Sequence, residues 1–307
     1  MIASESFIET VVERARAYVN DPDVEAKYTD DWVVRHSLMP SMVDVLSRLN
    51  LSQDNPVISR ADFTLSSTDR YYQLPPCIGE VLEVAVYDDQ WAVQQEAKPR
   101  HFLNPSGAGW RLEGNLLVVE PLPSETNATR TFSISYISNG QFYPHLSEDG
   151  GMLEQRTDGS HRLWLDHSPD KGALDRRPNA YAGAVVRLLP IAAGAVEERV
   201  VGASGFEGGR YYVDVRVPFT EQSVPADGLK YEVAPQGHEC LYDAIAMMTA
   251  LRLGSMSRQS ESSMKRLEVM YRTSLKTIKD NLHSMQQRRP KHWAKDTRDN
   301  PQYLYLM

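Results

Sequence analysis

Apolar residues recur at helical spacing near the start of the chain. The first stripe spans Phe7–Val19 and follows Ser4 and Ser6, either of which can cap a helix. A second stripe spans residues 29–49 and contains Pro40, which lacks a backbone donor and crowds the preceding helical turn. The sequence therefore predicts two N-terminal helices, of which the second is kinked or split at the proline.

A similar pattern returns near the end of the chain. One stripe covers residues 241–251, Gly254 and a serine-rich stretch break it, and a second stripe covers residues 264–285 and stops before Pro290. Two amphipathic helices joined by a short polar link form an antiparallel hairpin. We expect this hairpin to pack with the N-terminal helices as a four-helix unit.

Between the helical ends the apolar period changes to two, which is typical of half-buried strands. Residues 110–119 have the pattern of a hairpin whose turn contains Gly114. Residues 140–178 are polar, and we expect them to form an exposed loop or arm that contributes little to a core. The other expected strands are residues 81–87, 132–137, 184–189, 198–201 and 210–217.

These patterns predict an α+β fold, in which a helical bundle from both chain ends carries antiparallel β-sheet insertions. Four regions are expected: a helical domain, a first β region, an inserted loop with a second β region, and an extended C-terminal tail. They cover residues 1–55 with 231–289, 56–138, 139–230 and 290–307, in that order.

The composition is that of a globular protein, with 41% hydrophobic and 24% charged residues among 307. A net charge of −8 argues against a protein that coats nucleic acid, because such proteins are basic. The sequence contains no run of 18 apolar residues, so we expect no membrane span. The two cysteines, Cys77 and Cys240, lie far apart in sequence and indicate no disulfide framework.

No residue set matches a catalytic, cofactor-binding or metal-binding motif, so the sequence predicts none of these sites and no enzyme. His161, Asp166 and His167 cluster beside Arg162, but their spacing fits no metal site and we expect them to be solvated. Cys240 stands at a helix start, where a thiolate can be stabilised. We nevertheless expect Cys240 to belong to the apolar face of that helix.

The C-terminal tail combines positive charge with an apolar tip. Five basic residues stand against two aspartates in residues 288–299, and the last five residues are all apolar or aromatic. Such a tip is expected to dock, either on its own subunit or into a partner with an acidic surface. The alternative for the basic residues is that they are solvated and bind no partner. The candidate binding residues are Arg288, Arg289, Lys291, Trp293, Lys295, Arg298, Tyr303, Leu304, Tyr305, Leu306 and Met307.

The order of the segments resembles the head-to-tail adaptor, or connector, proteins of tailed bacteriophages. The likeness covers the helical ends and the first β region, whereas residues 139–230 depart from the compact adaptors as an insertion. It is a likeness of pattern and order rather than of one motif. The segments that carry it are Tyr28-Thr29-Asp30-Asp31-Trp32, Tyr71-Tyr72-Gln73-Leu74-Pro75, Trp110-Arg111-Leu112-Glu113-Gly114-Asn115 and Tyr231-Glu232-Val233-Ala234-Pro235, followed by the hairpin and the tail.

The resemblance implies a structural virion component without catalysis or cofactors. It implies a homo-oligomeric ring, commonly of twelve copies, which joins the portal protein to a tail or nozzle protein in the neck of the virion. The ring would assemble in the host cytoplasm, make transient non-specific contact with genomic DNA in its channel, and involve no membrane. The C-terminal tail would dock into the portal.

Two other readings compete with this one. The chain could be a carbohydrate- or receptor-binding β module on a helical oligomerisation stalk, with a sugar site lined by Trp91, Tyr143, Trp164 and Tyr181. It could also be an enzyme whose catalytic residues are assembled from distant parts of the sequence. A trimer in solution favours the binding module, whereas a ring of about a dozen copies favours the adaptor.

Overall fold

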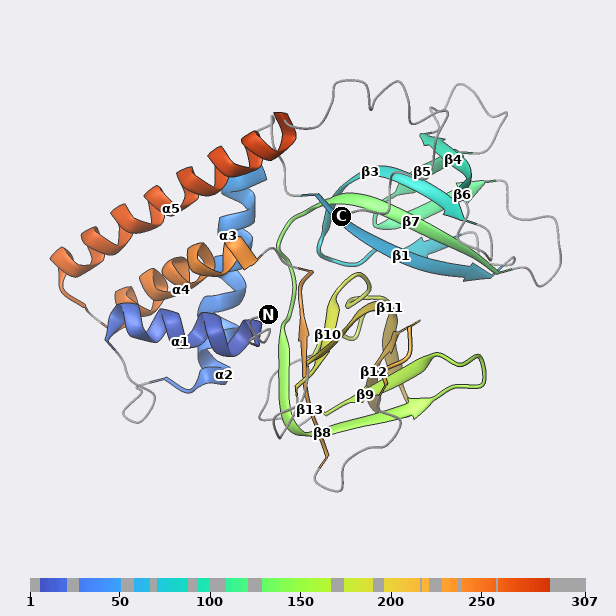
Figure 1. Cartoon of the computed structure of the whole chain (residues 1–307), viewed down its shortest axis with the longest axis horizontal. Coiled ribbons are helices and arrows are strands. Elements are labelled where there is room, and N and C mark those ends of the chain that lie inside the picture. Colours follow the sequence, from blue (N-terminus) through green and yellow to red (C-terminus); the bar gives the residue numbers. More distant parts are fainter. Residues whose placement is uncertain are drawn as a thin grey trace.

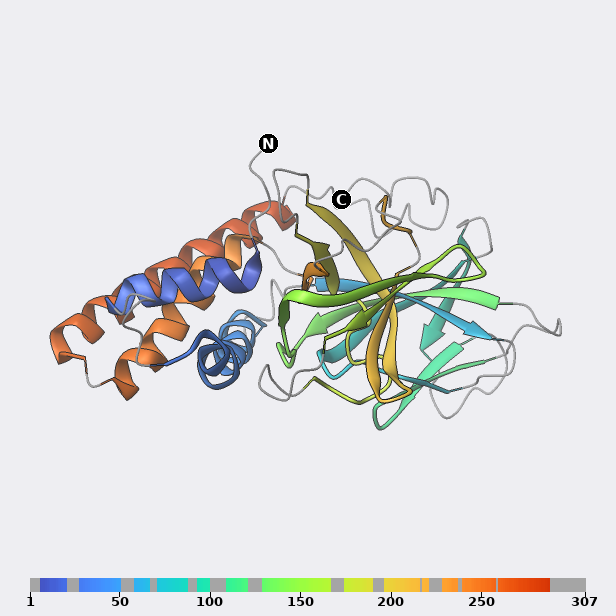
Figure 2. The same cartoon turned by 90° about the horizontal axis from the view of Figure 1, so that it is seen from below.

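The computed structural model of the chain describes residues 6–20, 28–50, 58–66, 71–87, 93–99, 109–120, 129–166, 174–189, 196–215, 217–220, 228–236, 239–257 and 259–287. Within these ranges the chain forms a helical unit, a seven-stranded sheet and a closed six-stranded barrel. The helical unit lies to one side of both β units in Figure 1 and in the perpendicular view of Figure 2.

The helical unit joins the two ends of the sequence, because α1 packs along α4 and α4 packs along α5. Ser6 caps α1 by accepting a hydrogen bond from the amide of Glu9, and Asn20 ends the helix with a φ of 53°. Arg16 donates to Asp30 at 2.9 Å and ties α1 to the next helix. The helices are α1 (Phe7–Val19), α2 (Asp30–Val33), α3 (Met39–Asn50), α4 (Tyr242–Met256) and α5 (Glu261–Gln287).

Pro40 changes the helix type rather than ending the helix. Between α2 and α3 the chain forms one π-helical stretch, η2 (Val34–Leu38), which ends two residues before the proline. The wider turn accommodates the missing donor and the proline ring. The hydroxyl of Ser41, the residue after the proline, donates to the carbonyl of Ser37 at 2.6 Å.

Gly254 lies inside α4 and does not break it, contrary to the sequence-based prediction. A methyl group at this position would overlap the sulfur atom of Met264 in α5. The glycine therefore allows the two helices of the hairpin to approach closely, and the helix continues for two more residues, to Met256.

The seven-stranded sheet has the order β1-β7-β3-β4-β5-β6-β2 and is antiparallel except between β4 and β5. The hairpin predicted at residues 110–119 is confirmed, and Gly114 has a φ of 65° in its turn. The strands are β1 (Ile58–Ser66), β2 (Tyr71–Gln73), β3 (Ile78–Tyr87), β4 (Val93–Pro99), β5 (Gly109–Glu113), β6 (Leu116–Glu120) and β7 (Thr129–Ser138).

The barrel closes in the order β10-β11-β12-β9-β8-β13. In β12, buried Tyr211, Val213 and Val215 alternate with half-buried Tyr212 and Asp214, as a barrel wall requires. The strands are β8 (His145–Gln155), β9 (His161–Leu165), β10 (Val185–Leu188), β11 (Glu197–Glu207), β12 (Arg210–Val215) and β13 (Leu229–Ala234).

The predicted architecture of a helical bundle with β-sheet insertions is wrong. The strands build two units of their own, and one of these is a closed barrel. The largest apolar cluster runs through both the helices and the barrel, whereas the seven-stranded sheet has a separate cluster. The barrel therefore provides much of the surface on which the helices pack, which periodicity alone does not reveal.

The prediction that residues 140–178 contribute little to the core is also wrong. Strands β8 and β9 come from this stretch, and Leu163 and Leu165 are fully buried in the barrel. Gly150 and Gly151 lie where β8 changes partner from β13 to β9. The ring of Tyr231 covers Gly151 so closely that a side chain there would overlap it.

A buried carboxylate joins the barrel to the helical unit. Glu232 of β13 is fully buried and accepts hydrogen bonds from the hydroxyl of Ser6 at 2.8 Å and from the amides of Phe7 at 3.0 Å and Ile8 at 2.7 Å. It also pairs with Arg187 of β10 at 3.1 Å. The first turn of α1 is thus held against the barrel wall by a charge placed at the positive end of the helix dipole.

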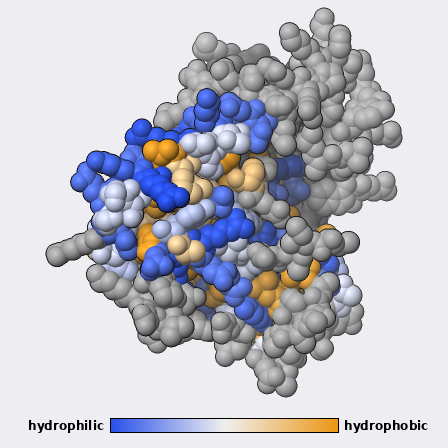
Figure 3. All heavy atoms as spheres, turned by 60° about the vertical axis from the view of Figure 1, so that its left-hand side comes forward, coloured by the Kyte–Doolittle hydropathy of each residue, from blue (hydrophilic) through white to orange (hydrophobic). Residues whose placement is uncertain are grey.

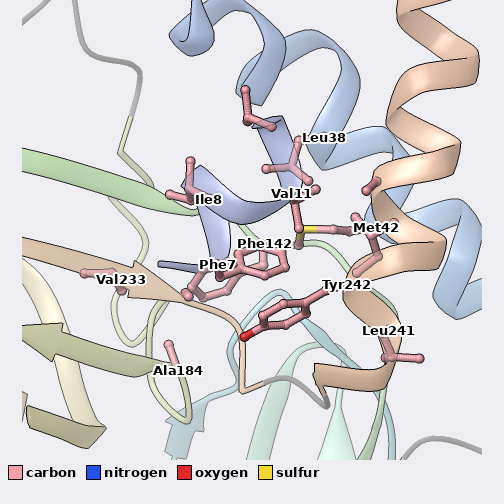
Figure 4. Packing of buried hydrophobic residues seen from close by; sticks show 14 of the residues in the cluster. Phe7, Ile8, Val11, Leu38, Met42, Phe142, Ala184, Val233, Leu241 and Tyr242 are labelled. Atoms are coloured by element: carbon pink, nitrogen blue, oxygen red, sulfur yellow. The ribbon is translucent and has the colours of Figure 1, made fainter. Parts of the chain in front are cut away.

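Apolar packing surrounds this contact. The rings of Phe7 and Tyr242 meet edge to face with 4.9 Å between their centroids, and Figure 4 shows Met42 and Phe142 beside them. Gly140 lies against the backbone of Met42 with a φ of 78°, where the chain passes from β7 towards the barrel. The cavity at this junction measures only about 40 Å³, which suits a water molecule rather than an organic ligand.

We predict that Arg187→Ala lowers the free energy of unfolding by about 3–5 kcal/mol, because it leaves Glu232 as a buried charge without its cationic partner. Urea unfolding followed by circular dichroism measures the loss. The control is Arg111→Ala, which removes the partner of Glu113 in a partly exposed pair and is expected to cost no more than about 1 kcal/mol. Equal losses in the two variants would contradict the assigned role of Glu232.

We also predict that Gly140→Ala destabilises the chain more than Gly159→Ala. Both glycines have positive φ values, 78° and 81°, so both substitutions strain the backbone by about 1 kcal/mol or more. At Gly140 an added methyl group would lie 2.9 Å from the carbonyl oxygen of Met42, whereas nothing lies within 4 Å at Gly159. Urea unfolding measures the free energy of unfolding that each variant loses. A larger loss for Gly140→Ala than for Gly159→Ala reports the tight contact at Gly140, and equal losses would contradict that contact.

Candidate functional site

The candidate binding residues of the C-terminal tail lie outside the described residues. This applies to Arg288, Arg289, Lys291, Trp293, Lys295, Arg298, Tyr303, Leu304, Tyr305, Leu306 and Met307. Their docking therefore stays a prediction. Helix α5 precedes them and is the nearest part of the chain that the structure describes.

Helix α5 buries one narrow stripe and presents the rest of its surface. Leu267, Tyr271, Leu275 and Ile278 are buried at spacings of three and four residues. Arg48 of α3 lies over the ring of Tyr271, 5.6 Å from its centroid. The side facing away from these contacts carries Val269, which is 64% exposed, although a valine gains from burial.

A shallow, open groove lies between α5 and the start of α4. We call it the α4–α5 groove; its volume is about 520 Å³. Figure 3 shows the molecule with the helical unit turned forward, and apolar side chains interrupt the polar surface in this view. Its lining combines apolar side chains with small hydroxyl-bearing ones: Cys240, Asp243, Met247, Val269, Met270, Thr273, Ser274, Thr277, Ile278 and Asn281.

Sequence reasoning missed this groove, and one signal could have found it. Val269 and Met270 are apolar but fall outside the buried stripe of α5, which marks a second apolar strip on the same helix. The prediction for Cys240 is corrected as well: its side chain is exposed on the groove wall and does not belong to the core. It lies in the short 3-10 turn η4 (Glu239–Leu241), so the helical face expected from α4 does not extend to it.

The prediction that the histidine cluster beside Arg162 is solvated is wrong for His161, which lies in the barrel wall. His161 is 2% exposed in β9 and accepts a hydrogen bond from the amide of Phe219 at 3.2 Å, while His167 lies outside the described residues. Burial, and then the charge of Arg199, lower the pKa of His161, so this imidazole is held neutral. Arg162 is also buried and donates to Asp214 at 2.7 Å. These side chains hold the barrel wall together.

A serine, a histidine and an aspartate also meet in the barrel, but their hydrogen bonds do not form a catalytic triad. His145 contacts the hydroxyl of Tyr231 at 3.0 Å, and that hydroxyl accepts from the amide of Asp166 at 2.6 Å. Ser147 is buried and donates to Asp166 at 3.5 Å. A nucleophilic serine needs a base in contact with it, and here the histidine faces a tyrosine.

The aromatic residues proposed to line a sugar site have different environments. Tyr181 is buried, and its ring meets Phe142 edge to face. Trp164 donates to Glu154 at 2.6 Å, and Arg162 lies 5.2 Å from the centroid of its ring. Tyr143 is 39% exposed, and Trp91 lies outside the described residues. A sugar-binding platform needs aromatic rings whose faces are open to solvent. Tyr181 is buried, and Arg162 covers part of the ring of Trp164.

Within the described part of the chain, no group of three or more histidine, cysteine, aspartate or glutamate residues could hold a metal ion. None of the helices in that part is long and apolar enough to cross a membrane. No protein-family model matches the chain, and no curated protein is significantly similar to it. The geometry of the described residues therefore carries the functional argument.

We predict that a thiol reagent such as 5,5′-dithiobis(2-nitrobenzoate) labels Cys240 quickly and Cys77 only after unfolding. Cys240 is exposed on the groove wall, although partial burial raises its pKa. Burial raises the pKa of Cys77 to about 11. At pH 8 a thiol with that pKa is ionised in roughly one molecule in a thousand, and the thiolate is the reactive form. Fast labelling that persists in Cys240→Ser would contradict this assignment.

Proposed function

We propose that the chain is a structural adaptor subunit of a tailed-bacteriophage virion, which forms a ring between the portal protein and a tail or nozzle protein. One observation carries the proposal: the helical unit is assembled from both chain ends, and its longest helix leads directly into the basic, aromatic-tipped tail. The order of segments that resembles the adaptors ends in this same helix and tail.

The one-sided packing of α5 supports an assembling subunit. A helix of 27 residues that buries a single stripe leaves a large surface for contacts with other chains. Covering the exposed Val269 and Met270 in the α4–α5 groove would lower the free energy of the system, because their apolar surface would be removed from water.

The tail fits the role of a connector to the portal. Residues 291–302 form a tether that can extend to about 40 Å, so the five residues after it can reach a neighbouring molecule. Burial of two tyrosines and two leucines stabilises such a contact by several kcal/mol at ~25 cal/mol per Å², less the entropy lost by the tether. The basic residues before the tip guide it towards acidic surface.

The acidic charge of the subunit suits a channel through which DNA moves. A net charge of −8 per copy, repeated around a ring, repels phosphate groups rather than binding them. A basic wall would instead hold the DNA backbone and release its counterions, which favours binding over sliding. Contact with DNA in this proposal is accordingly transient and non-specific.

We predict that deletion of residues 291–307 leaves the fold intact and abolishes binding to the portal. Folding is measured by urea unfolding, and binding by sedimentation of the chain with purified portal rings. The matched variant keeps the tail and changes Tyr303, Leu304, Tyr305 and Leu306 to serine, which removes the apolar tip without removing the basic residues.

The two variants separate the apolar contribution from the charges. We expect the serine variant to lose most of the affinity and the deletion to lose all of it, because the tip supplies the buried area and the charges mainly raise the association rate. Unchanged portal binding by the deleted chain would overturn the proposed role of the tail. Loss of the folded state would show instead that the tail packs on its own subunit.

A further inference from the structure

A short segment after β12 lies against the barrel wall. It comprises residues 217–220, and its contacts are with the first residues of β9 and β11; we call it the barrel strap. Phe219 is 2% exposed and belongs to the large apolar cluster, whereas the other three residues are exposed. The strap therefore inserts one aromatic side chain into the core and leaves the rest of itself at the surface.

Two side chains of the wall accept hydrogen bonds from the backbone of the strap. The amide of Phe219 donates to Nδ1 of His161 at 3.2 Å, and the amide of Thr220 donates to the carboxylate of Glu197 at 2.9 Å. Both acceptors can take up a proton, which a backbone carbonyl in a strand ladder does not do at ordinary pH. The hold on the strap consequently depends on pH.

Arg199 of β11 is the third anchor. Its Nε donates to the carbonyl of Pro218 at 3.1 Å, and its guanidinium lies 5.4 Å from the centroid of the Phe219 ring. Arg199 also pairs with Glu197 at 3.3 Å. One fixed cation is thus already part of the anchoring, and a second cation on His161 would be repelled by it.

Only the neutral imidazole of His161 can hold the strap. Because Nδ1 accepts from the amide of Phe219, the neutral ring carries its proton on Nε2, and a doubly protonated ring has no acceptor atom left. His161 is also buried, so a charge on its ring would be removed from water. Protonation therefore breaks the bond to the strap and favours a position of the ring in solvent.

The charged groups around the imidazole come from β11 alone among the described residues. Burial, and then the charge of Arg199, lower the pKa of His161, and Glu197 opposes them. Gln155 of β8 and Val215 of β12 lie opposite His161 in the neighbouring strands and carry no charge. The closed strap thus holds His161 neutral at pH 7.

We propose that the barrel strap is an acid-sensitive latch, in which protonation of His161 releases Phe219 and exposes the apolar surface that its ring covers. In the open form the imidazole is solvated and takes up a proton near its ordinary pKa of about 6.5. In the closed form it takes up the proton only at lower pH. Closure is therefore fully stable above pH 6.5 and weakens as the pH falls towards the pKa of the closed form, by up to about tenfold per pH unit.

Glu197 does not account for this window of pH. Burial opposes the ionisation of its carboxylate, but the hydrogen bonds from Thr220 and the charge of Arg199 outweigh it and lower the pKa of Glu197. An ordinary glutamate has a pKa of about 4.3, so Glu197 stays charged between about pH 5 and pH 7. Its own anchor weakens only in stronger acid. The response near neutral pH belongs to His161.

Hydrogen exchange of the Phe219 amide in the full chain, followed by NMR between about pH 5 and pH 7, tests the latch. After correction for the intrinsic exchange rate, its protection should fall by up to about tenfold per pH unit below pH 6.5. The amide of Val213, which lies inside β12, should keep its protection. His161→Asn retains an acceptor near the position of Nδ1 but takes up no proton, so its protection at Phe219 should not depend on pH.

The matched control is His36→Asn, which changes an exposed histidine of the helical unit and should keep the pH dependence of the original chain. The slope against pH is compared rather than the absolute protection, because asparagine fills less space than histidine. If His161→Asn does not fold, NMR titration of the His161 ring in the original chain decides. Its pKa should lie below 6.5, and the loss of protection at Phe219 should level off at that pKa.

Three results would overturn the latch. Protection of the Phe219 amide that stays constant through this range would show that protonation of His161 does not release the strap. An equal slope in His161→Asn and the original chain would assign the response to another group. A parallel loss of protection at Val213 would show that acid opens the barrel itself rather than the strap.

Discussion

One buried carboxylate determines how the helices meet the barrel. Glu232 has no contact with water, so each of its lone pairs needs a partner inside the protein. The hydroxyl of Ser6, two amides of α1 and the guanidinium of Arg187 supply them. A charge buried in this way is costly unless every partner is in place, and this fixes the first turn of α1 on the barrel wall with little freedom.

The helices and the barrel consequently behave as one packed body, and the seven-stranded sheet is joined to it by a few close contacts. Gly183 lies against Ala61 where barrel and sheet meet, and Asn50 donates to the carbonyl of Ser138 at 2.7 Å at the end of α3. The sheet keeps an apolar cluster of its own. The surfaces of the helical unit that face away from both β units are free to serve assembly.

The sequence predicted local structure well and long-range structure poorly. Capping by Ser6, the helix from residue 29 to residue 50 and the hairpin around Gly114 depend on neighbours in the chain, and all three are confirmed. The closed barrel depends on pairing between β8 and β13, which lie about 80 residues apart and leave no periodic signal. Glu232 likewise looks like a surface residue of a strand until its partner Ser6, 226 residues away, is known.

The same distinction explains why the predictions for His161 and Cys240 were wrong. His161 seemed solvated because its neighbours in sequence are polar, yet the barrel buries it together with Arg162, and their hydrogen bonds are made within the barrel wall. Cys240 seemed buried because an apolar helix follows it, yet it borders an open groove. The hydrogen bonds of His161 and Arg162 therefore stabilise the barrel wall, whereas exposed apolar side chains occur in both units: Val269 of α5 is 64% exposed and Phe206 of β11 is 42% exposed.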